Sequence, residues 1–81
     1  MSRTVVLQVG DSHRLRLWKD RIVYAGMISE RVYSIIQMKW EFVYRGYSLH
    51  LFFPVGQSSI RIDGVNLVVD SVTPSEIRLH V

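Results

Sequence analysis

Ser12 and His13 are the first residues along the chain whose types and spacing would allow catalysis. They follow Gly10 and Asp11 directly after a mostly apolar run, residues 4–9, so Ser12 stands at the tip of a predicted buried strand. A serine hydroxyl in such a position attacks an acyl carbon when a nearby base takes its proton. These are the residue types of a hydrolase nucleophile, and the elements around Ser12 decide between catalysis and a turn.

The stretch resembles the first block of the GDSL-type esterases and lipases, in which a serine lies at the tip of the first strand. That family carries its Asp and His on a late D-x-x-H stretch, whereas Asp70 and His80 are ten residues apart here. A nucleophile elbow is followed by a helix, but the residues after Ser12 alternate as a strand, which points His13 to the opposite face. We therefore predict that Ser12 is a turn residue and assign no catalytic residue.

The composition limits the remaining functions. The chain has 81 residues, 48% of them hydrophobic, with no cysteine and a formal net charge of +3. A domain of this size buries only about two thirds of its unfolded surface, so the apolar surplus indicates a protein partner or a homo-oligomer. Without cysteine there is no disulfide and no thiolate metal site. No signal peptide or membrane-length apolar run is visible, which predicts a cytoplasmic protein with no membrane partner.

Eight of the ten basic residues are arginines, which suit planar contacts with phosphate, base edges or carboxylates. Arg14, Arg16 and Trp18 share one face of a predicted strand, where they would hold phosphate and stack a base. The same residues also suit a solvated edge strand whose charges prevent aggregation. Further basic residues, without a recognisable spacing, are Lys39, Arg45, Arg61 and Arg78.

Alternating apolar and polar residues indicate an all-β fold. The alternating runs are residues 14–18, 59–63, 65–69 and 76–81, and Asp63-Gly64 is a strong two-residue hairpin signal. Residues 28–38 fit a helix or a strand, and their β-branched and aromatic content favours a strand whose apolar side carries Val32, Ile36 and Met38. We predict one domain over residues 1–81, a small meander or barrel of about seven short strands.

Residues 5–17 can be laid on residues 51–62 with one residue deleted, which suggests an internal repeat. The matched pairs are Gly10 with Gly56, Ser12 with Ser58, Leu15-Arg16-Leu17 with Ile60-Arg61-Ile62, Val23 with Val68 and Val32 with Ile77. The alternative is chance similarity between strands. A true repeat makes residues 5–45 and 49–81 two copies of one β unit, and each copy would fold on itself or exchange strands with the other.

Residues 49–81 resemble the carbon storage regulator family of small bacterial RNA-binding proteins. The matching parts are Leu49 and Leu51, Val55-Gly56-Gln57, Ser59-Ile60-Arg61-Ile62, Asp63-Gly64, residues 67–69 and Ile77-Arg78-Leu79. Residues 5–45 follow the same plan more loosely. The resemblance implies intertwined subunits whose first and last strands pair, with basic residues there gripping a GGA-bearing RNA hairpin.

The chain departs from that family at the RNA grip. The two basic residues that precede V-G in the family are Phe53-Pro54 in one half and Leu7-Gln8 in the other. Only Arg45 roughly matches a family RNA contact. The fold implied by the resemblance tolerates these changes, but the family's RNA site does not carry over as a whole.

Leu51, Phe52 and Phe53 are consecutive large apolar residues, so a strand must point them to both of its faces. One of those faces needs a cover, which is a dimer mate, a second layer or a binding partner. His13, His50 and His80 lack metal-ligand spacing, so no metal, cofactor or small-molecule substrate is predicted.

Two functions of different classes follow. The first is a small RNA-binding post-transcriptional regulator, and it requires a contiguous positive patch on one side. Its candidate RNA-binding residues are Arg14, Arg16, Trp18, Arg45, Arg61 and Arg78. The second is a protein-binding or self-assembling β module, a subunit or inhibitor that docks through Leu51, Phe52 and Phe53 while its arginines are dispersed. Neither is an enzyme.

Overall fold

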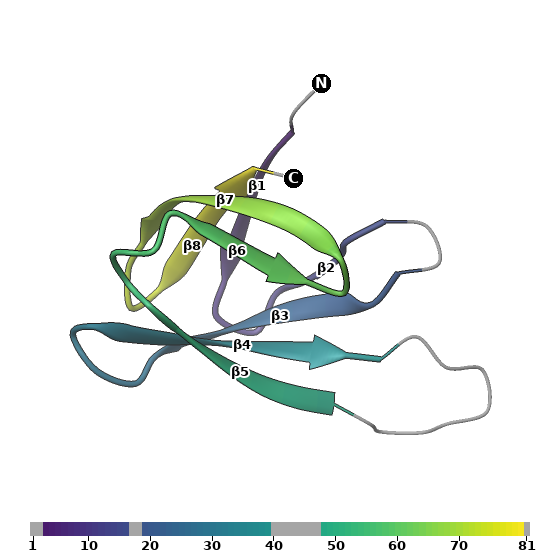
Figure 1. Cartoon of the computed structure of the whole chain (residues 1–81). Helices are drawn as coiled ribbons and strands as arrows, with labels where there is room; N and C mark the ends of the chain where they lie inside the picture. Colours follow the sequence, from purple (N-terminus) through teal and green to yellow (C-terminus); the bar gives the residue numbers. More distant parts are fainter. Residues whose placement is uncertain (1–2, 17–18, 40–47, 81) are drawn as a thin grey trace.

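The computed structural model describes residues 3–16, 19–39 and 48–80, and it confirms the predicted all-β fold (Figure 1). The described residues form eight strands rather than about seven, and they contain no helix that could cross a membrane. The strands are β1 (Thr4–Gln8), β2 (Ser12–Arg14), β3 (Arg21–Met27), β4 (Val32–Met38), β5 (Ser48–Pro54), β6 (Ser59–Ile62), β7 (Val65–Val72) and β8 (Glu76–His80).

Two four-stranded antiparallel sheets make up the fold. Sheet 1 has the order β1-β8-β7-β6, and sheet 2 has the order β2-β3-β4-β5. The sheets form two layers around one shared core and do not close into a barrel (Figure 1). The core residues are Val5, Leu7, Leu15, Ile22, Tyr24, Tyr33, Ile35, Ile60, Ile62, Val65, Leu67, Ile77 and Leu79.

The two sheets have the same plan when the first four strands are exchanged for the last four. Replacing β1–β4 by β5–β8, and the reverse, turns the order β1-β8-β7-β6 into β5-β4-β3-β2. The registers agree, because Val5 lies opposite Leu79 as Leu51 lies opposite Ile35. Each half of the chain therefore gives its first strand to the sheet that the other half completes.

The irregularities of the sheets also fall at corresponding places. β3 shifts register between Tyr24 and Gly26, and β7 does so between Val69 and Ser71. The residue left without a partner by each bulge is Ala25 in β3 and Asp70 in β7. A bulge bends the strand and re-aims the side chain at that point, so the two halves place different side chains on equivalent bends.

The pairing corrects the sequence alignment of the two halves in three places, because Ser12 corresponds to Ser59 rather than Ser58, Ile77 to Tyr33 rather than Val32, and Leu15 to Ile62. Leu15 donates its backbone N–H to the carbonyl of Asp20 at 3.0 Å, and the residue in the equivalent position of sheet 1 is Ile62, paired with Val65. The alignment had matched Leu15 with Ile60. It was wrong because four residues connect Leu15 to Asp20, whereas a two-residue turn connects Ile62 to Val65.

That two-residue turn is the predicted hairpin of Asp63 and Gly64. Both have positive φ, 51° and 74°, the conformation that a turn with the twist of the flanking strands requires. The Asp63 carboxylate accepts the backbone N–H of Asp20 at 2.9 Å. The hairpin of sheet 1 is thereby tied to the start of β3 in sheet 2.

β4 confirms the predicted strand, but its inward face is not the predicted one. Residues 33, 35 and 37 are buried, whereas Met38 is 43% exposed on the outward side. The inward face includes Gln37, only 6% exposed, because its amide Nε2 donates to the Asp20 carboxylate at 2.6 Å. A buried amide is tolerated once its hydrogen bonds are made. The prediction from apolar alternation was therefore wrong about which face of β4 is buried.

Candidate functional site

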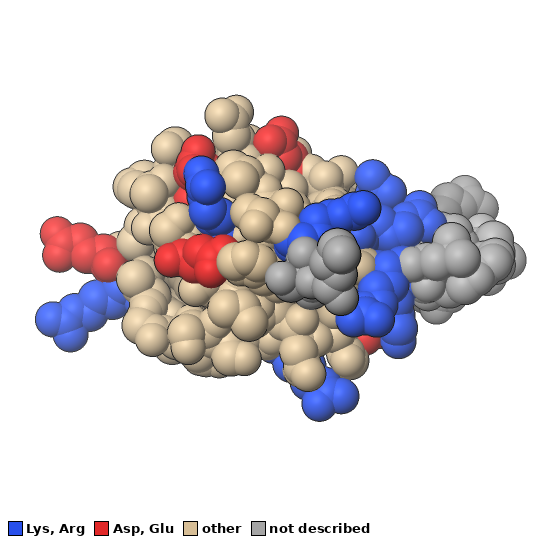
Figure 2. Space-filling view, turned by 90° about the horizontal axis from the view of Figure 1, so that it is seen from above, with Lys and Arg blue, Asp and Glu red and all other residues tan. Residues whose placement is uncertain are grey.

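Basic side chains gather at one end of the molecule, where the β2–β3 connection, the end of β4 and the β6–β7 turn meet. Figure 2 shows the Lys and Arg side chains concentrated towards one end of the view, with most acidic groups elsewhere. We call this part the basic end, and its described members are Arg14, Arg16, Lys19, Arg21 and Lys39. Such a concentration of charge attracts anions over a Debye length.

The centre of the basic end is a cross-strand pair of arginines. Arg14 of β2 lies directly opposite Arg21 of β3. The preceding pair is His13 with the fully buried Ile22, so the next pair, Arg14 with Arg21, lies on the outward face of sheet 2. Like charges directly opposite each other destabilise a sheet, and a negatively charged ligand between them reverses that effect.

Ser12 lies beside this pair and acts as a neutral partner. Its hydroxyl Oγ accepts a hydrogen bond from Arg21 Nη2 at 3.4 Å. Ser12 is the first residue of β2 and follows the turn that Val9 and Gly10 form. The prediction of a turn residue is therefore wrong by position, because Ser12 begins the strand that follows the turn, and its hydroxyl contacts a guanidinium.

The acidic groups of the basic end are already engaged. Asp20 is 4% exposed, and its carboxylate lies 3.4 Å from Lys39 Nζ in addition to its bond from Gln37. Asp63 accepts the N–H of Asp20. A buried carboxylate needs such partners to offset its desolvation, so these two groups hold the loop in place, and Asp20 offsets part of the charge of Lys39.

The pKa of His13 reports the positive potential. It is lowered from its ordinary value of 6.5 by burial first, and then by the charges of Arg3 and Arg21. Desolvation and like charge both disfavour the imidazolium form. An anion bound near Arg21 would act in the opposite direction.

The residues predicted to contact RNA lie in several places. Arg14 and Arg16 belong to the basic end, but β2 stops at Arg14, so Arg16 lies beyond the strand that was predicted to include it. Arg61 and Arg78 are exposed on the strands β6 and β8 of sheet 1. Trp18 and Arg45 lie outside the described residues.

Lys19 and Arg21 were not singled out from the sequence. Lys19 Nζ lies 4.0 Å from the position that a Cβ on Gly64 would take, so it reaches from the β2–β3 connection to the hairpin of sheet 1. The sequence feature that could have indicated both residues is the short connection at residues 16–19 between two predicted strands. Basic residues lie before and after that connection.

β5 carries the predicted protein-docking residues and forms one edge of sheet 2. Leu51 and Phe53 are half-buried towards the core, and the Phe53 ring centroid lies 5.7 Å from that of Tyr33. Phe52 points outward and is 56% exposed. The strand thus has one face on the core and one large aromatic residue without cover among the described residues.

A threonine, a histidine and an aspartate meet on sheet 1. His80 Nδ1 lies 2.6 Å from the Asp70 carboxylate, and His80 Nε2 lies 3.3 Å from Thr4 Oγ1. The sequence did not indicate this contact, because Asp70 and His80 are ten residues apart and a bulge at Asp70 within β7 brings them together. The order of groups is that of a proton relay, but all three are at least partly exposed.

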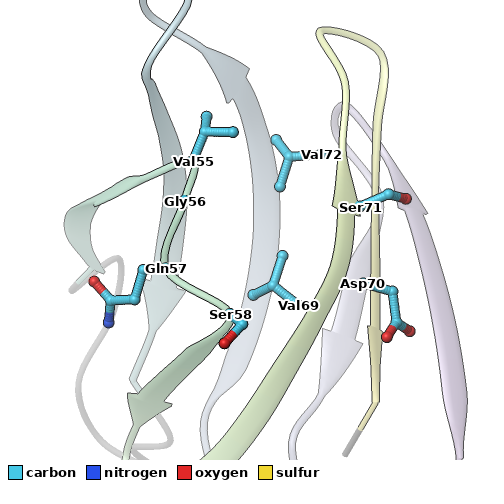
Figure 3. A pocket seen from close by; sticks show the side chains of 8 residues that line it. All are labelled: Val55, Gly56, Gln57, Ser58, Val69, Asp70, Ser71 and Val72. Atoms are coloured by element: carbon cyan, nitrogen blue, oxygen red, sulfur yellow. The ribbon is translucent and has the colours of Figure 1, made fainter.

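A hollow of about 210 Å³ lies between residues 55–58 and residues 69–72. Val55, Val69 and Val72 point into it, whereas Asp70 and Ser71 point away (Figure 3). Its lining is therefore mixed, because Gln57 and Ser58 lie beside the three valines, and the Asp70 carboxylate is turned away from it. The described residues also contain no group of three or more His, Asp or Glu side chains that could hold a metal ion.

No protein-family model matches the chain, and neither a curated protein nor a solved structure matches it. Its function is therefore inferred from the site, since a fold alone does not assign one.

Proposed function

We propose that the chain is a non-enzymatic, cytoplasmic RNA-binding protein, a post-transcriptional regulator whose basic end holds RNA phosphates. The observation that carries the proposal is the Arg14–Arg21 cross-strand pair on the outward face of sheet 2. Arginines at opposite positions of a ladder offer several guanidinium donors to one phosphate. A bound phosphate also lowers the repulsion between the two like charges.

The surrounding charges extend this site. Arg16, Lys19 and Lys39 lie on the neighbouring connection and strand end, where they add positive charge for further phosphates of an RNA backbone. Contacts of this kind release counterions and make binding salt-dependent. The resemblance of residues 49–81 to the carbon storage regulators favours a GGA-bearing RNA hairpin as the ligand.

Fluorescence anisotropy with a labelled GGA hairpin and a scrambled hairpin tests the proposal, over roughly 50–300 mM salt. We expect Arg21→Gln to weaken binding and to reduce the slope of log K against log[salt] by about 1. Arg78→Gln is the matched control, because Arg78 is an exposed arginine on sheet 1 that lies 3.9 Å from Glu76. Equal affinity of the two variants would contradict a site at the basic end.

His13 gives a second readout at the same site. A bound phosphate offsets the charges of Arg3 and Arg21, so the pKa of His13 should rise when RNA is added. An NMR titration of the imidazole protons measures this shift, and His50 serves as the internal control on β5. A pKa of His13 that does not change on saturation with RNA would place the ligand elsewhere.

One observation favours the second candidate function, a protein-binding β module. Phe52 exposes 56% of its surface on an edge strand without a charged residue. That surface is apolar and lies on a different strand from the members of the basic end.

A further inference from the structure

The backbone of β5 has one paired side and one open side. Val55 donates its N–H to the carbonyl of Arg31 in the direction of β4, at 2.7 Å. Since N–H and C=O groups alternate in direction along a strand, Phe53 and Leu51 also point theirs towards β4. The groups of Ser48, His50 and Phe52 therefore point outward, beyond the edge of sheet 2, whereas the carbonyl of Pro54 already accepts the N–H of Gln57 at 3.1 Å.

β5 lacks the protection that the other edges carry. In β1, the outward N–H of Gln8 is bonded by the Asp11 carboxylate at 3.0 Å. β2 and β6 have three and four residues, and each contains an arginine, Arg14 or Arg61. β5 has seven residues and no charged side chain except His50 when protonated. Long neutral edges are templates for strand addition, and charges or short strands prevent it.

We propose that a second copy of this chain occupies the open side of β5, strand against strand, in an antiparallel pair with two-fold symmetry. Leu51 then lies opposite the partner's Leu51, and His50 lies opposite the partner's Phe52. The outward groups of His50 and Phe52 exchange both hydrogen bonds, as a ladder of this type requires. Ser48 meets Pro54 at the ladder's end, where a missing N–H is tolerated.

The distribution of charge selects this orientation. The Ser48 end of β5 lies against Met38, which precedes Lys39 and faces Arg21. The Pro54 end lies against Val32, which follows the turn containing Glu30 and Arg31. An antiparallel pair puts the basic end of one copy beside the mixed-charge end of the other, whereas a parallel pair would put the two basic ends together.

The exposed aromatic residue selects the occupant. Phe52 lies on the outward face of sheet 2, and the antiparallel pair places it diagonally from the partner's Phe52 on the same face. Diagonal neighbours in a sheet are within reach of aromatic side chains. A second copy therefore covers Phe52, the most exposed large apolar side chain of β5, and it does so with an edge of identical length and the same lack of charge.

Sedimentation and light scattering over roughly 1 μM to 1 mM protein measure the association, because short edge contacts of this size give weak dimers. We expect Phe52→Lys to raise the dimer Kd at least about tenfold, since it introduces two like charges at the contact. Val68→Lys is the control, because Val68 is 48% exposed on the outward side of β7 in sheet 1. Monomers throughout the range, or equal effects of the two substitutions, would overturn the proposal.

A single cysteine tests the register, because the chain has no cysteine of its own. Non-hydrogen-bonded pairs hold their Cα atoms about 4.5 Å apart, within the range of a disulfide. Leu51→Cys should thus form a covalent dimer on mild oxidation, and Val68→Cys should not. If circular dichroism finds Leu51→Cys unfolded, a mixture of the single variants His50→Cys and Phe52→Cys tests the same register, because these two positions lie opposite each other in the proposed dimer. A folded variant that stays monomeric after oxidation would overturn the register.

This inference does not rest on RNA binding. The edge of β5 contains none of the basic end, so Phe52→Lys and Arg21→Gln separate the two properties. Loss of hairpin binding in Arg21→Gln with the dimer intact, or the reverse, identifies which proposal fails.

Discussion

Sheet 1 and sheet 2 follow the same plan, yet their outward faces differ. On sheet 1, polar side chains meet partners of opposite character, as Arg78 meets Glu76 and His80 meets Asp70. On sheet 2, Arg14 meets Arg21 across the strands, and Phe52 at the edge is bare. The side-chain contacts of sheet 1 thus join groups of opposite character, whereas sheet 2 places two like charges at opposite positions of its ladder.

This difference between the two outward faces indicates which residues can acquire a binding role when the two halves of a fold share one plan. Alternation and turns are enough to build both sheets around one core, so they leave the outward residues free to differ. The bulge shows this directly, because it carries Ala25 in one half and Asp70 in the other. We therefore expect changes in the core to affect both halves alike, and changes on the surface to affect them differently.

The largest expected effect is in the shared core. Ile22 of β3 and Leu67 of β7 occupy corresponding positions, and both are fully buried. Replacing either with alanine leaves a cavity and should lower the free energy of unfolding by about 2–5 kcal/mol. Urea denaturation should find one cooperative transition for each variant. Two separate transitions would mean that the halves unfold independently and that the shared core is not one unit.

The next largest expected effect on the free energy of unfolding concerns the hydrogen bond between Gln37 and Asp20, which has no counterpart in sheet 1. Gln37→Leu removes the amide that donates to Asp20, whereas the residue of sheet 1 that corresponds to Asp20 is the buried Val65. Leaving a buried carboxylate without this donor should cost about 1–3 kcal/mol. Lys39→Gln is the control, because Lys39 is partly exposed and its pair with Asp20 should contribute less than about 1 kcal/mol. Chemical denaturation that finds the order reversed would contradict this account.

Two buried tyrosines should respond in opposite directions. Tyr24 donates its hydroxyl to the carbonyl of Thr73 at 2.5 Å, whereas the Tyr33 hydroxyl is buried with no hydrogen-bond partner among the described residues. Tyr24→Phe should therefore lower the free energy of unfolding by about 1 kcal/mol, and Tyr33→Phe should leave it unchanged or raise it by a similar amount. Thermal or urea denaturation of the two variants measures both signs.

The same pair gives a pH dependence. Burial, and then the neighbouring Tyr24, raises the pKa of Tyr33 from 10.0 to about 12. The folded protein keeps this proton at a pH where the unfolded chain loses it, so the contribution is present below pH 10 and is lost as the pH rises towards about 12. Tyr33→Phe should flatten the decline in stability over this interval. A decline that stays as steep in Tyr33→Phe would assign it to other groups.

The smallest expected changes in stability come from substitutions on the outward faces of the two sheets. Arg21→Gln removes a like-charge neighbour of Arg14 and should raise stability by a few tenths of a kcal/mol, about the size of a cross-strand pair. Arg78→Gln removes the attraction to Glu76 and should lower it by about 0–1 kcal/mol. Differential scanning calorimetry at low salt detects both shifts. If both variants shift the melting temperature in the same direction, the contrast between the two faces is wrong.

Alternation and turn residues predicted the all-β class, the hairpin at Asp63 and the strand over β4. They did not predict which face of β4 is buried, because the burial of Gln37 depends on Asp20, which lies on another strand connection. Residue spacing likewise hid the contact of His80 with Asp70, since a hairpin and a bulge bring them together. The Arg14–Arg21 pair depends on the register between two strands, which hydrophobic pattern alone does not set.

The exchange of first strands has a consequence for the order of folding. β1 pairs with β8, so Thr4 and His80 come together only after a loop of most of the chain has closed. Closing such a loop is entropically costly, and proteins rich in distant pairs fold slowly. During synthesis, β1 therefore leaves the ribosome long before its partner strand exists. β1 thus stays unpaired while the residues up to β8 are made, and an apolar strand without its partner is open to aggregation or to chaperones during that interval.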